Sequence, residues 1–565
     1  MARTTVQPIS ATCSHAGATI AEPRVPGAIY LASLVLNLLT LGLPLVSLQV
    51  YDRIIPNRSR ETLAFLIIAL AITLALDLVL RSLRSALLAW RAMLFTRQLE
   101  HEVVTRLVHT GSDTVEREPV AVHLNRFAGI AALGNFHAGS SRLTAIDLPF
   151  VFVTFAILAI VGGQIVLVPI GLFCLFAALA IGRSRDYRQI AVERSNQDDK
   201  KYDFISEVLT GILTVKGMAM EPQMLRRFER LQQTVAQINL RAILVAHSAQ
   251  SSAAIYGNLS QIVVVAFGAV RVIDGDLSIG ALACCTMLAG QVLQPLLRAI
   301  SLWSEKEAAA HWRSQIHELL TFPAVKPGTD IAPAVKGHIR FDQVFLQQPG
   351  QAQPLLRNVS LSVTPGFIIG MAGSDGSGRT ALLKLVFGDI APTSGRVIVD
   401  GVATSEDSFA NIRKSIAYVG PNPAIFRGTI LENLTCFQPH RSHFARQMAV
   451  LIGLEQAIHE LPNGYDTMLG ESIHEIIPAS VAQQITIARA LSTGARVVLF
   501  DEATAILDQF AEFAFIAALR KLRGGLTVIV ATHRPSILAT ADHVYTLKHA
   551  QLLDTRESPV ARGVA

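Results

Sequence analysis

The sequence predicts a multidomain protein in which an α-helical membrane domain with six spans is fused to a soluble α/β domain of the phosphate-loop type. Three observations lead to this fold class. Of the 565 residues, 51% are hydrophobic and only 16% are charged, whereas soluble domains carry about 25% charged residues. Apolar stretches of the length that a bilayer requires crowd the first 305 residues. Beyond residue 337, short β-rich runs alternate with helical patterns, as in α/β domains.

The domain boundaries follow from these changes in composition. Residues 1–27 are polar and contain several prolines, so we expect a cytoplasmic tail and no cleaved signal peptide. Residues 28–305 form the predicted membrane domain. Residues 306–336 form the predicted linker, which begins as a helix and is then interrupted by prolines. Residues 337–565 form the predicted α/β domain.

Six apolar stretches are expected to cross the membrane, because a bilayer core requires about 20 apolar residues per helix. Only Gly162, Gly163 and Gln164 separate the third stretch from the fourth, so these two are predicted to form a tight hairpin. The predicted spans are Ala28–Val50, Leu63–Leu80, Leu148–Gly162, Ile165–Ile181, Ala253–Ile273 and Ile279–Trp303.

Basic residues indicate the orientation of the spans. The two long connections, after the second and after the fourth span, are helical in pattern and rich in arginine, while the other connections are short and poorer in Lys and Arg. Because basic loops stay in the cytoplasm, both long connections and both termini are predicted to be cytoplasmic. Asp77 and Arg81, near the end of the second span, are interpreted as a local ion pair and not as a functional intramembrane charge.

Net charge and cysteine content argue against two other classes of protein. The formal charge of +6 fits basic cytoplasmic loops and does not indicate nucleic-acid binding. The five cysteines lack the spacing of metal ligands. We interpret them as small buried hydrophobic residues in a reducing compartment, not as a disulfide framework.

A glycine-rich loop between a strand and a helix is the main functional motif of the second half. The run Phe367–Ala372 is predicted to be a buried strand, and the helix follows the loop directly. Glycines let backbone N–H groups turn toward phosphate oxygens, and the helix N-terminus adds a favourable dipole. The spacing matches the G-x-x-x-x-G-K-[ST] motif with arginine in place of the lysine, and the alternative is a glycine-rich turn without a ligand. The predicted nucleotide-binding residues are Gly373, Ser374, Asp375, Gly376, Ser377, Gly378, Arg379, Thr380 and Ala381.

Two further strands are predicted to bring catalytic groups to this loop. One ends in Asp501 and Glu502, and another is followed by His533. Thr380 and Asp501 are the predicted Mg²⁺ ligands, the carboxylate acting through a water, because hard oxygen donors suit this ion. Glu502 is the predicted acceptor of a proton from an attacking water. His533 is predicted to contact the terminal phosphate or to orient that water.

These motifs resemble those of the ATP-binding cassette (ABC) exporters, in which a six-helix membrane domain precedes a nucleotide-binding domain. The resemblance covers nearly all of residues 28–550. Within the family, the chain is most similar to the type I secretion ATPases of Gram-negative bacteria. The stretches that carry this similarity are Leu48–Asn57 after the first span, and Gly280-Ala281-Leu282 with Met287–Leu296 in the sixth.

The resemblance implies cofactors, location and partners. It implies ATP and Mg²⁺, the inner membrane, and export of a secreted polypeptide whose identity the sequence does not disclose. It implies a homodimer, or a heterodimer with a second ABC half-transporter, working with a periplasmic adaptor and an outer-membrane channel. Coupling helices are implied near Val120–Gly129 and Glu207–Met220.

Four positions depart from the family pattern. Arg379 replaces the lysine of the phosphate loop, Pro421 stands where a glutamine would join Mg²⁺, and Gln348 stands where an aromatic ring would stack on adenine. The signature loop Leu-Ser-Gly-Gly-Gln aligns with Ile477–Val481, which reads Ile-Pro-Ala-Ser-Val. In this family each ATP lies between the phosphate loop of one subunit and the signature loop of the other, so these changes bear on turnover.

Two hypotheses of function therefore stay open. In the first, the chain is an ATP-hydrolysing half of an exporter. In the second, it is a catalytically weak or silent structural or regulatory half that pairs with an active ABC subunit. Arg379, Pro421 and the altered signature favour the second hypothesis, whereas the retained Glu502 and His533 favour the first. A channel or receptor with an unrelated α/β domain would require these carboxylate and histidine positions to be coincidental.

Overall fold

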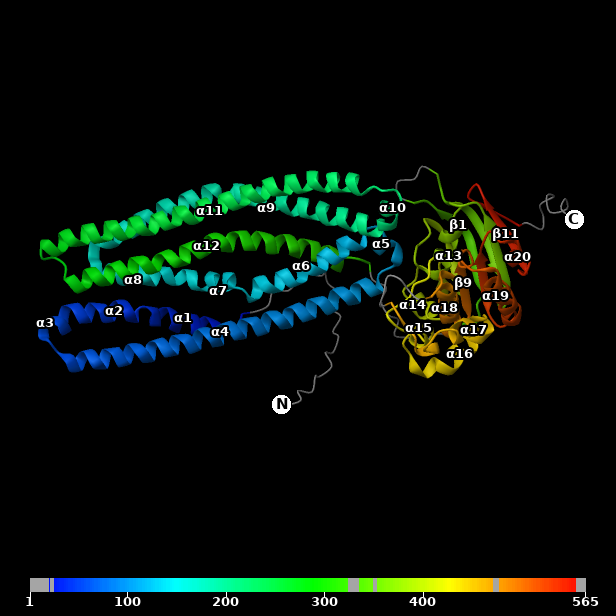
Figure 1. Cartoon of the computed structure of the whole chain (residues 1–565), viewed down its shortest axis with the longest axis horizontal. Coiled ribbons are helices and arrows are strands. Elements are labelled where there is room, and N and C mark those ends of the chain that lie inside the picture. The colour runs from blue at the N-terminus through cyan, green and yellow to red at the C-terminus, as the bar shows by residue number, and fades with distance from the viewer. Residues whose placement is uncertain (1–19, 21–24, 324–334, 349–352, 471–476, 555–565) are drawn as a thin grey trace. The chain divides into compact units, whose positions relative to one another are not determined.

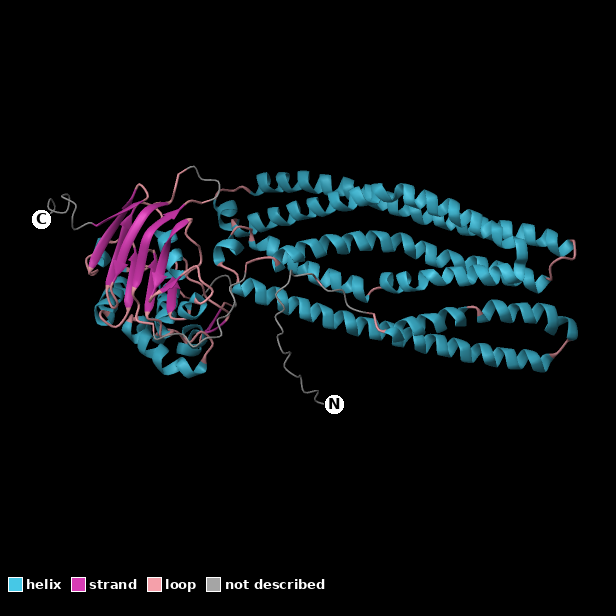
Figure 2. Ribbon diagram, turned by 180° about the vertical axis from the view of Figure 1, so that it is seen from behind, coloured by secondary structure: helices cyan, strands magenta, loops and turns pink. Residues whose placement is uncertain are grey.

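The chain folds into two compact units, which are described separately. The computed structural model describes residue 20 and residues 25–323, 335–348, 353–470 and 477–554. The first unit comprises residues 1–108 and 116–322, and the second comprises residues 109–115 and 323–565. The first unit is helical, whereas the strands lie in the second unit (Figure 2).

Four long helices dominate the first unit (Figure 1). They are α4 (Arg60–His109), α9 (Leu167–Thr210), α11 (Glu221–Ile273) and α12 (Ile279–Leu320), with 42 to 53 residues each. At about 1.5 Å per residue, each is longer than the hydrocarbon core of a bilayer. The shorter helical elements are α1 (Gly27–Thr40), α2 (Gly42–Gln49), the π-helical η1 (Val50–Ile54), α3 (Ile55–Asn57), α6 (Val120–Ala138), α7 (Ser140–Asp147), η2 (Leu148–Phe150), α8 (Val151–Gly162), η3 (Gly163–Val166) and α10 (Ile212–Gly217).

The helices confirm a membrane-spanning helical domain, while the count of six spans stays a prediction. Every predicted span lies on helical elements, and the predicted hairpin turns at Gly163, the first residue of η3, directly after α8. A shorter apolar helix covers Ile279–Val292. Among the described residues, four stretches are long and apolar enough to cross a membrane: Gly27–Asn57, Arg60–His109, Val122–Leu175 and Glu221–Ile273.

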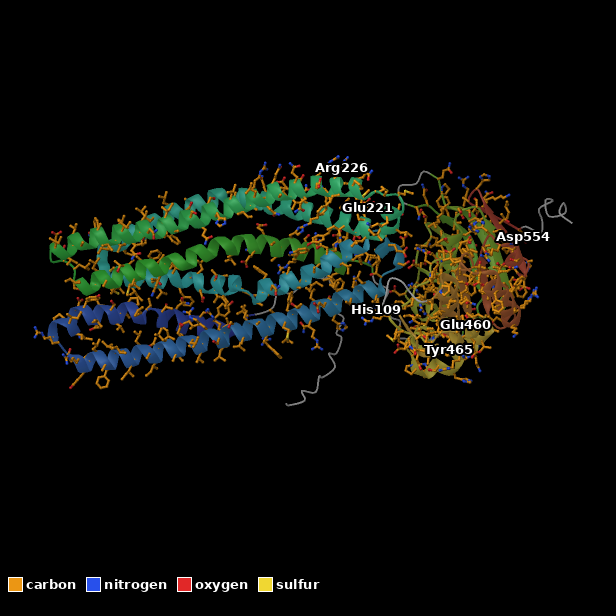
Figure 3. All side chains as sticks on the ribbon, in the orientation of Figure 1. His109, Glu221, Arg226, Glu460, Tyr465 and Asp554 are labelled. Atoms are coloured by element: carbon orange, nitrogen blue, oxygen red, sulfur yellow. The ribbon has the colours of Figure 1, made fainter. Side chains whose placement is uncertain are left out.

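The first half of α4 exposes large apolar side chains. On α4, the side chains of Phe65, Ile72 and Leu78 are between 64% and 74% exposed. Figure 3 shows side chains projecting from the outer faces of α4 and α11. A helix that is apolar toward its surroundings is typical of contact with lipid or with another subunit.

The cysteines fit their predicted role only in part. Cys284 and Cys285 are buried in the core of the first unit, as expected of small hydrophobic residues, whereas Cys174 is exposed. None of the described cysteines forms a disulfide, and Cys13 lies outside the described residues.

One polar contact joins two of the three sequence stretches that carry the family resemblance in the first unit. The Asp52 carboxylate in η1 accepts hydrogen bonds from the backbone N–H of Gly280, at 2.8 Å, and from the hydroxyl of Ser278. Ser278 is also the N-cap of α12 and accepts from the N–H of Ala281. The carboxylate lies at the positive end of the α12 dipole, which stabilises it there. Asp52 therefore fastens the turn after the first span to the start of the last long helix.

A buried ion pair joins three other helices and was not predicted. The Arg84 guanidinium on α4 donates to the Asp147 carboxylate at the end of α7, at 2.8 Å, and to the hydroxyl of Ser33 on α1, at 2.7 Å. Nearby, Arg81 donates to Asp77 at 2.6 Å, which confirms the predicted local pair. Since a buried cation is stable only when it is paired, Arg84 fixes the relative positions of these helices.

The second unit contains a mostly parallel six-stranded sheet and an antiparallel four-stranded sheet. The six strands run in the order β12-β11-β3-β10-β9-β6, with only β12 antiparallel to its neighbour, and the four strands in the order β2-β1-β4-β5. The strands are β1 (Ile339–Leu346), β2 (Leu356–Val363), β3 (Ile368–Gly373), β4 (Ser394–Val399), β5 (Val402–Ala403), β6 (Ile416–Val419), β9 (Val497–Asp501), β10 (Thr527–Ala531), β11 (His543–Lys548), β12 (Gln551–Asp554), and the separate pair β7 (Gly428–Thr429) and β8 (Met468–Leu469).

Helices cover this sheet, and two hydrophobic clusters form around it. Alternate residues of β9 belong to different clusters, Val498 and Phe500 to one and Val497 and Leu499 to the other. A strand buried on both faces must be apolar throughout, which explains its continuous hydrophobic sequence. The helices are α13 (Arg379–Phe387), α14 (Phe409–Arg413), α15 (Ile430–Leu434), η4 (Pro439–Arg441), α16 (Ser442–Leu451), α17 (Leu454–His459), η5 (Gly464–Asp466), α18 (Ala479–Ser492), α19 (Gln509–Leu522) and α20 (Pro535–Leu538).

A short segment of the first long connection, His109–Val115, also belongs to the second unit. Ser112, at the start of α5 (Ser112–Glu116), donates its backbone N–H to the Asp389 carboxylate at 2.7 Å, and its hydroxyl to the same group. The implied coupling stretch Val120–Gly129 instead lies within the continuous helix α6, whereas the implied stretch Glu207–Met220 contains the short helix α10.

Replacing Gly280 by alanine should destabilise the first unit. A Cβ at this position would lie 2.5 Å from the Asp52 carboxylate and 2.7 Å from the carbonyl oxygen of Leu48, so we expect a loss of about 1–3 kcal/mol. Gly290, on the same helix, is the matched control, because its Cβ would meet nothing within 4 Å. Gly290→Ala should stabilise the helix by up to about 1 kcal/mol. Thermal unfolding of the purified chain in detergent measures both changes, and equal melting temperatures for the two variants would contradict the Asp52 contact.

Candidate phosphate-binding site

Parallel pairing brings three strand ends to one edge of the six-stranded sheet. β10 pairs with β3 on one side and β9 on the other, and Ala531 lies opposite both Met371 and Asp501. The phosphate loop follows β3, Glu502 follows β9, and His533 follows β10 by two residues. Ligands of parallel sheets bind at this carboxyl edge, where loops of neighbouring strands converge.

The loop after β3 has a backbone that requires glycine. Gly376 and Gly378 have φ angles of 74° and 104°, in the left-handed region that favours glycine. A Cβ on Gly378 would also lie 2.9 Å from the carbonyl oxygen of Leu355. The helix α13 begins at the next residue, Arg379, so the loop ends at a helix N-terminus as the sequence predicts.

Two buried polar atoms of the loop fit an anionic ligand. The Oγ of Ser377 and the Nη1 of Arg379 are buried and have no hydrogen-bond partner among the described residues. The Arg379 side chain is only 6% exposed. A buried donor without an acceptor is costly, and a phosphate oxygen would satisfy the guanidinium with a charge-assisted hydrogen bond. The residues of the loop therefore suit the phosphates of a nucleotide.

The other nitrogen of Arg379 is the centre of a charged cluster. Nη2 lies 2.8 Å from Oε1 of Glu502 and 2.6 Å from Nε2 of His533. A guanidinium can only donate, whereas the Asp375 carboxylate beside the same Nε2 can only accept, so this nitrogen cannot hydrogen-bond to both groups at once. The Asp375 carboxylate, 95% exposed, lies 3.4 Å from Arg379 and 2.9 Å from His533. The arginine of the loop is thus neutralised within the chain by the predicted catalytic base.

The predicted metal ligands lie next to each other. The hydroxyl of Thr380 donates to Oδ1 of Asp501 at 3.1 Å, and the hydroxyl of Tyr418 donates to Oδ2 of Asp501 at 2.7 Å. No cluster of three or more His, Cys, Asp or Glu side chains able to hold a metal occurs in the described part of the chain. Mg²⁺ at phosphate sites needs only one or two protein oxygens beside the phosphates, so Thr380 and Asp501 fit this ion.

Glu502 has an unusual backbone conformation. Its φ angle is 49°, in the left-handed region, and its N–H donates to the carbonyl oxygen of Ala531 at 2.9 Å. A residue with a Cβ adopts this conformation at a cost of about 1–3 kcal/mol, and such strain is concentrated at functional sites. The strain turns the Glu502 side chain toward Arg379 and His533.

The structure therefore brings the predicted side chains of Arg379, Thr380, Asp501, Glu502 and His533 together at one sheet edge. Gly373, Ser374, Asp375, Gly376, Ser377 and Gly378 form the loop itself, and Ala381 is buried in the first turn of α13. Their roles in binding and catalysis stay predictions.

Tyr418 is the polar contact of the site that sequence reasoning missed. It lies on β6, whose pairing with β9 places Tyr418 opposite Leu499, two residues before Asp501. The available signal was a hydroxyl-bearing ring near the end of an otherwise apolar strand. Only the strand order shows that β6 neighbours β9.

In the segment aligned with the signature loop, the helix N-cap has no N–H and a nearby hydroxyl is hydrogen-bonded within the chain. Helix α18 begins at Ala479, and Pro478 at its N-cap offers neither an N–H nor a side-chain cap. The hydroxyl of Ser480, in the first turn of this helix, accepts a hydrogen bond from the N–H of Asp508 at 3.2 Å. Asp508 itself caps α19, and the N–H of Ala511 holds the pKa of its carboxyl below the ordinary value.

The two remaining departures from the family pattern lie on the surface. Gln348 is exposed after the end of β1, and Pro421 is exposed after the end of β6. The carbonyl oxygen of Gly420, just before Pro421, accepts from the buried Gln483 amide at 3.0 Å, and the same amide donates to the carbonyl oxygen of Ala503. Gln483 on α18 thereby links the segment that follows β6 to the segment that follows β9 and Asp501.

Both halves of the sequence match models of known protein families. Residues 27–296 match the family model described as the ABC transporter transmembrane region, and residues 356–505 match the model described as ABC transporter. A solved bacterial Atm1-family ABC exporter with ATP bound has the same fold, with a TM-score of 0.81 at 19% identity, and the match covers 94% of each chain.

Similar curated proteins extend over most of the chain. The toxin RTX-I translocation ATP-binding protein of Actinobacillus pleuropneumoniae is 27% identical over 93% of this chain and 74% of its own length. The α-hemolysin translocation ATP-binding protein HlyB of Escherichia coli is 27% identical over 93% and 76%. The cyclolysin secretion/processing ATP-binding protein CyaB of Bordetella pertussis is 27% identical over 97% and 77%.

Replacing Glu502 by glutamine should strengthen phosphate binding. The change removes the negative charge 2.8 Å from Arg379, so the phosphate no longer has to displace a carboxylate from the guanidinium. We expect the affinity for inorganic tripolyphosphate without metal to rise about tenfold, which corresponds to one charge-assisted hydrogen bond. Calorimetric titration of the full chain in detergent with EDTA measures it. Glu455→Gln, which removes the same charge beside His459 on α17, should bind like the wild type. Equal affinities for all three proteins would contradict the competition.

Proposed function

The chain belongs to the ABC transporter family, and from this premise we propose that it is one half of a dimeric ABC exporter that uses ATP to move a polypeptide across the inner membrane. The observation that carries the proposal is the convergence of Arg379, Thr380, Asp501, Glu502 and His533 in a chain that also carries membrane-spanning helices. The names of the similar proteins, which translocate or secrete toxins, support a polypeptide as cargo.

The proposal includes a division of the chain and an orientation. Residues 28–305 cross the membrane six times, residues 306–336 form the linker, and residues 337–565 bind nucleotide on the cytoplasmic side. The arginine-rich connections support this orientation. As in type I secretion, the dimer would work with a periplasmic adaptor and an outer-membrane channel.

The residues of the site have distinct proposed roles. The loop N–H groups and Arg379 bind the ATP phosphates. Thr380 and Asp501 hold Mg²⁺, which when bound neutralises phosphate charge. When phosphate takes over the guanidinium of Arg379, the Glu502 carboxylate is released from its ion pair. It then accepts a proton from the attacking water, while His533 contacts the terminal phosphate. Binding of ATP thus prepares the base for hydrolysis.

A second candidate function is a weakly active or silent half that pairs with a different, active ABC subunit. The observation that favours it is the N-terminus of α18, where Pro478 lacks an N–H donor and the hydroxyl of Ser480 already accepts a hydrogen bond from the N–H of Asp508. Such a segment offers few contacts to the ATP of a partner. In that assembly the Arg379 site would be completed by the signature loop of the other chain, and the opposite ATP site would be the defective one.

ATPase activity that depends on Glu502 tests the first function. Full chain reconstituted in lipid vesicles should hydrolyse ATP, and Glu502→Gln should lower kcat by at least about 100-fold, because the proton acceptor is lost. Release of inorganic phosphate measures the rate. Glu455→Gln serves as the control with an equal change of charge and should retain the wild-type rate. A rate that Glu502→Gln leaves unchanged would refute catalysis by this site.

Restoring the signature segment separates the two functions. In a homodimer, the fourfold change Pro478→Ser, Ala479→Gly, Ser480→Gly and Val481→Gln should raise kcat about tenfold or more, because glycine N–H groups can then approach the terminal phosphate. The same protein carrying Glu502→Gln should stay inactive. If the restored chain gains no activity alone but does so with a second ABC half-transporter, the heterodimer is favoured.

A further inference from the structure

Tyr418 lies directly on the carboxylate that the proposed function gives to the metal. Its phenolic hydroxyl donates to Oδ2 of Asp501 at 2.7 Å, while the hydroxyl of Thr380 donates to Oδ1 at 3.1 Å. Asp501 is only 2% exposed. A buried carboxylate requires donors on its oxygens, so the two hydroxyls together set both the charge distribution and the rotation of this group.

The Tyr418 ring is held from two sides. The parallel pairing of β6 with β9 fixes its backbone beside that of Asp501. Its ring packs against Phe387 at the end of α13, with the centroids 5.8 Å apart, and the Arg413 guanidinium covers the Phe387 ring at 4.2 Å. The hydroxyl is therefore presented to Asp501 by a packed side chain that cannot swing away without disturbing the sheet edge.

The hydroxyl of Tyr418 matters because, at the nearby position 421, the chain has a proline where the family has a polar side chain. Pro421, three residues after Tyr418, has no side-chain donor or acceptor and no N–H. Hydrogen-bond partners of metal-ligating carboxylates set the affinity of such sites, commonly by about 10- to 100-fold.

We propose that Tyr418 is a positioning residue for the Mg²⁺ site. Resting on the proposed function, the inference is that the phenol holds Asp501 in the orientation in which it and Thr380 bind the ion, and so sets the affinity of the nucleotide-bound site for a divalent cation. Tyr418 would act on the ion through the Asp501 carboxylate that its hydroxyl contacts. Its hydrogen bond orients the Asp501 carboxylate from strand β6, and Pro421 has no side-chain group that could make such a bond.

The test uses Mn²⁺ as a paramagnetic substitute for Mg²⁺. The full chain in detergent is saturated with a non-hydrolysable ATP analogue, and bound Mn²⁺ is measured by electron paramagnetic resonance during titration. Tyr418→Phe should weaken Mn²⁺ binding about tenfold. The affinity for the analogue in EDTA should stay at the wild-type value, because the phosphate loop is unchanged.

Tyr465→Phe is the matched control. Tyr465, labelled in Figure 3, is a buried tyrosine in η5, and its hydroxyl has no hydrogen-bond partner among the described residues. This variant loses the same atom from η5, which contributes none of the proposed binding residues, and should bind Mn²⁺ like the wild type. A melting temperature for Tyr418→Phe close to that of Tyr465→Phe shows that the fold is kept.

Three results would overturn the inference. If Tyr418→Phe binds Mn²⁺ like the wild type, Tyr418 does not position the metal site, although the proposed function stands. If Tyr418→Phe weakens binding of the analogue in EDTA as much as it weakens Mn²⁺ binding, the ring supports the loop as a whole. If the wild type with the analogue retains no Mn²⁺, both the inference and the Mg²⁺-dependent function fail.

Discussion

The parallel pairing of β3, β10 and β9 is the constraint on which the candidate site depends. Each strand is buried on both faces, so its register is fixed by packing and a slip would carry apolar side chains out of the two clusters around the sheet. With the register fixed, the phosphate loop, Asp501 and His533 must emerge at one edge. Thr380 of the loop is 121 positions from Asp501 in sequence, and the adjacent strands β3, β10 and β9 bring the two residues together.

Burial of Arg379 gives this site its particular character. A buried guanidinium keeps its charge and must be paired, and in this chain Glu502 and His533 serve as its partners. A lysine in the same loop would bring a compact ammonium with rotatable donors, whereas arginine brings a planar fork with several fixed donors. Nη1, which has no hydrogen-bond partner among the described residues, is available to an incoming phosphate, and that phosphate would compete with Glu502 for the same cation. Binding and catalysis are therefore coupled through one side chain.

In the membrane unit, polar contacts fix the positions of helices whose apolar faces determine little about which helix they pack against. Asp52 fastens η1 to the start of α12, and Arg84 with Asp147 and Ser33 fastens α4 to α7 and α1. Among apolar helices in lipid, packing is weakly directional, so a few buried hydrogen bonds carry much of the specificity. The same logic explains why Gly280 stands where the Asp52 carboxylate approaches the backbone.

Local sequence determined the class of the protein, the helical membrane half, and the strand–loop–helix order around Gly373–Thr380, because hydrophobic content, periodicity and glycine spacing act over short stretches of chain. It also indicated Asp501, Glu502 and His533, since each follows a recognisable strand. The local sequence did not predict contacts between segments that are far apart in the chain. The ion pair of Arg379 with Glu502, the Tyr418 hydroxyl on Asp501, and the Arg84–Asp147 pair were decided by tertiary structure, because strand order and helix packing alone determine which buried polar groups meet.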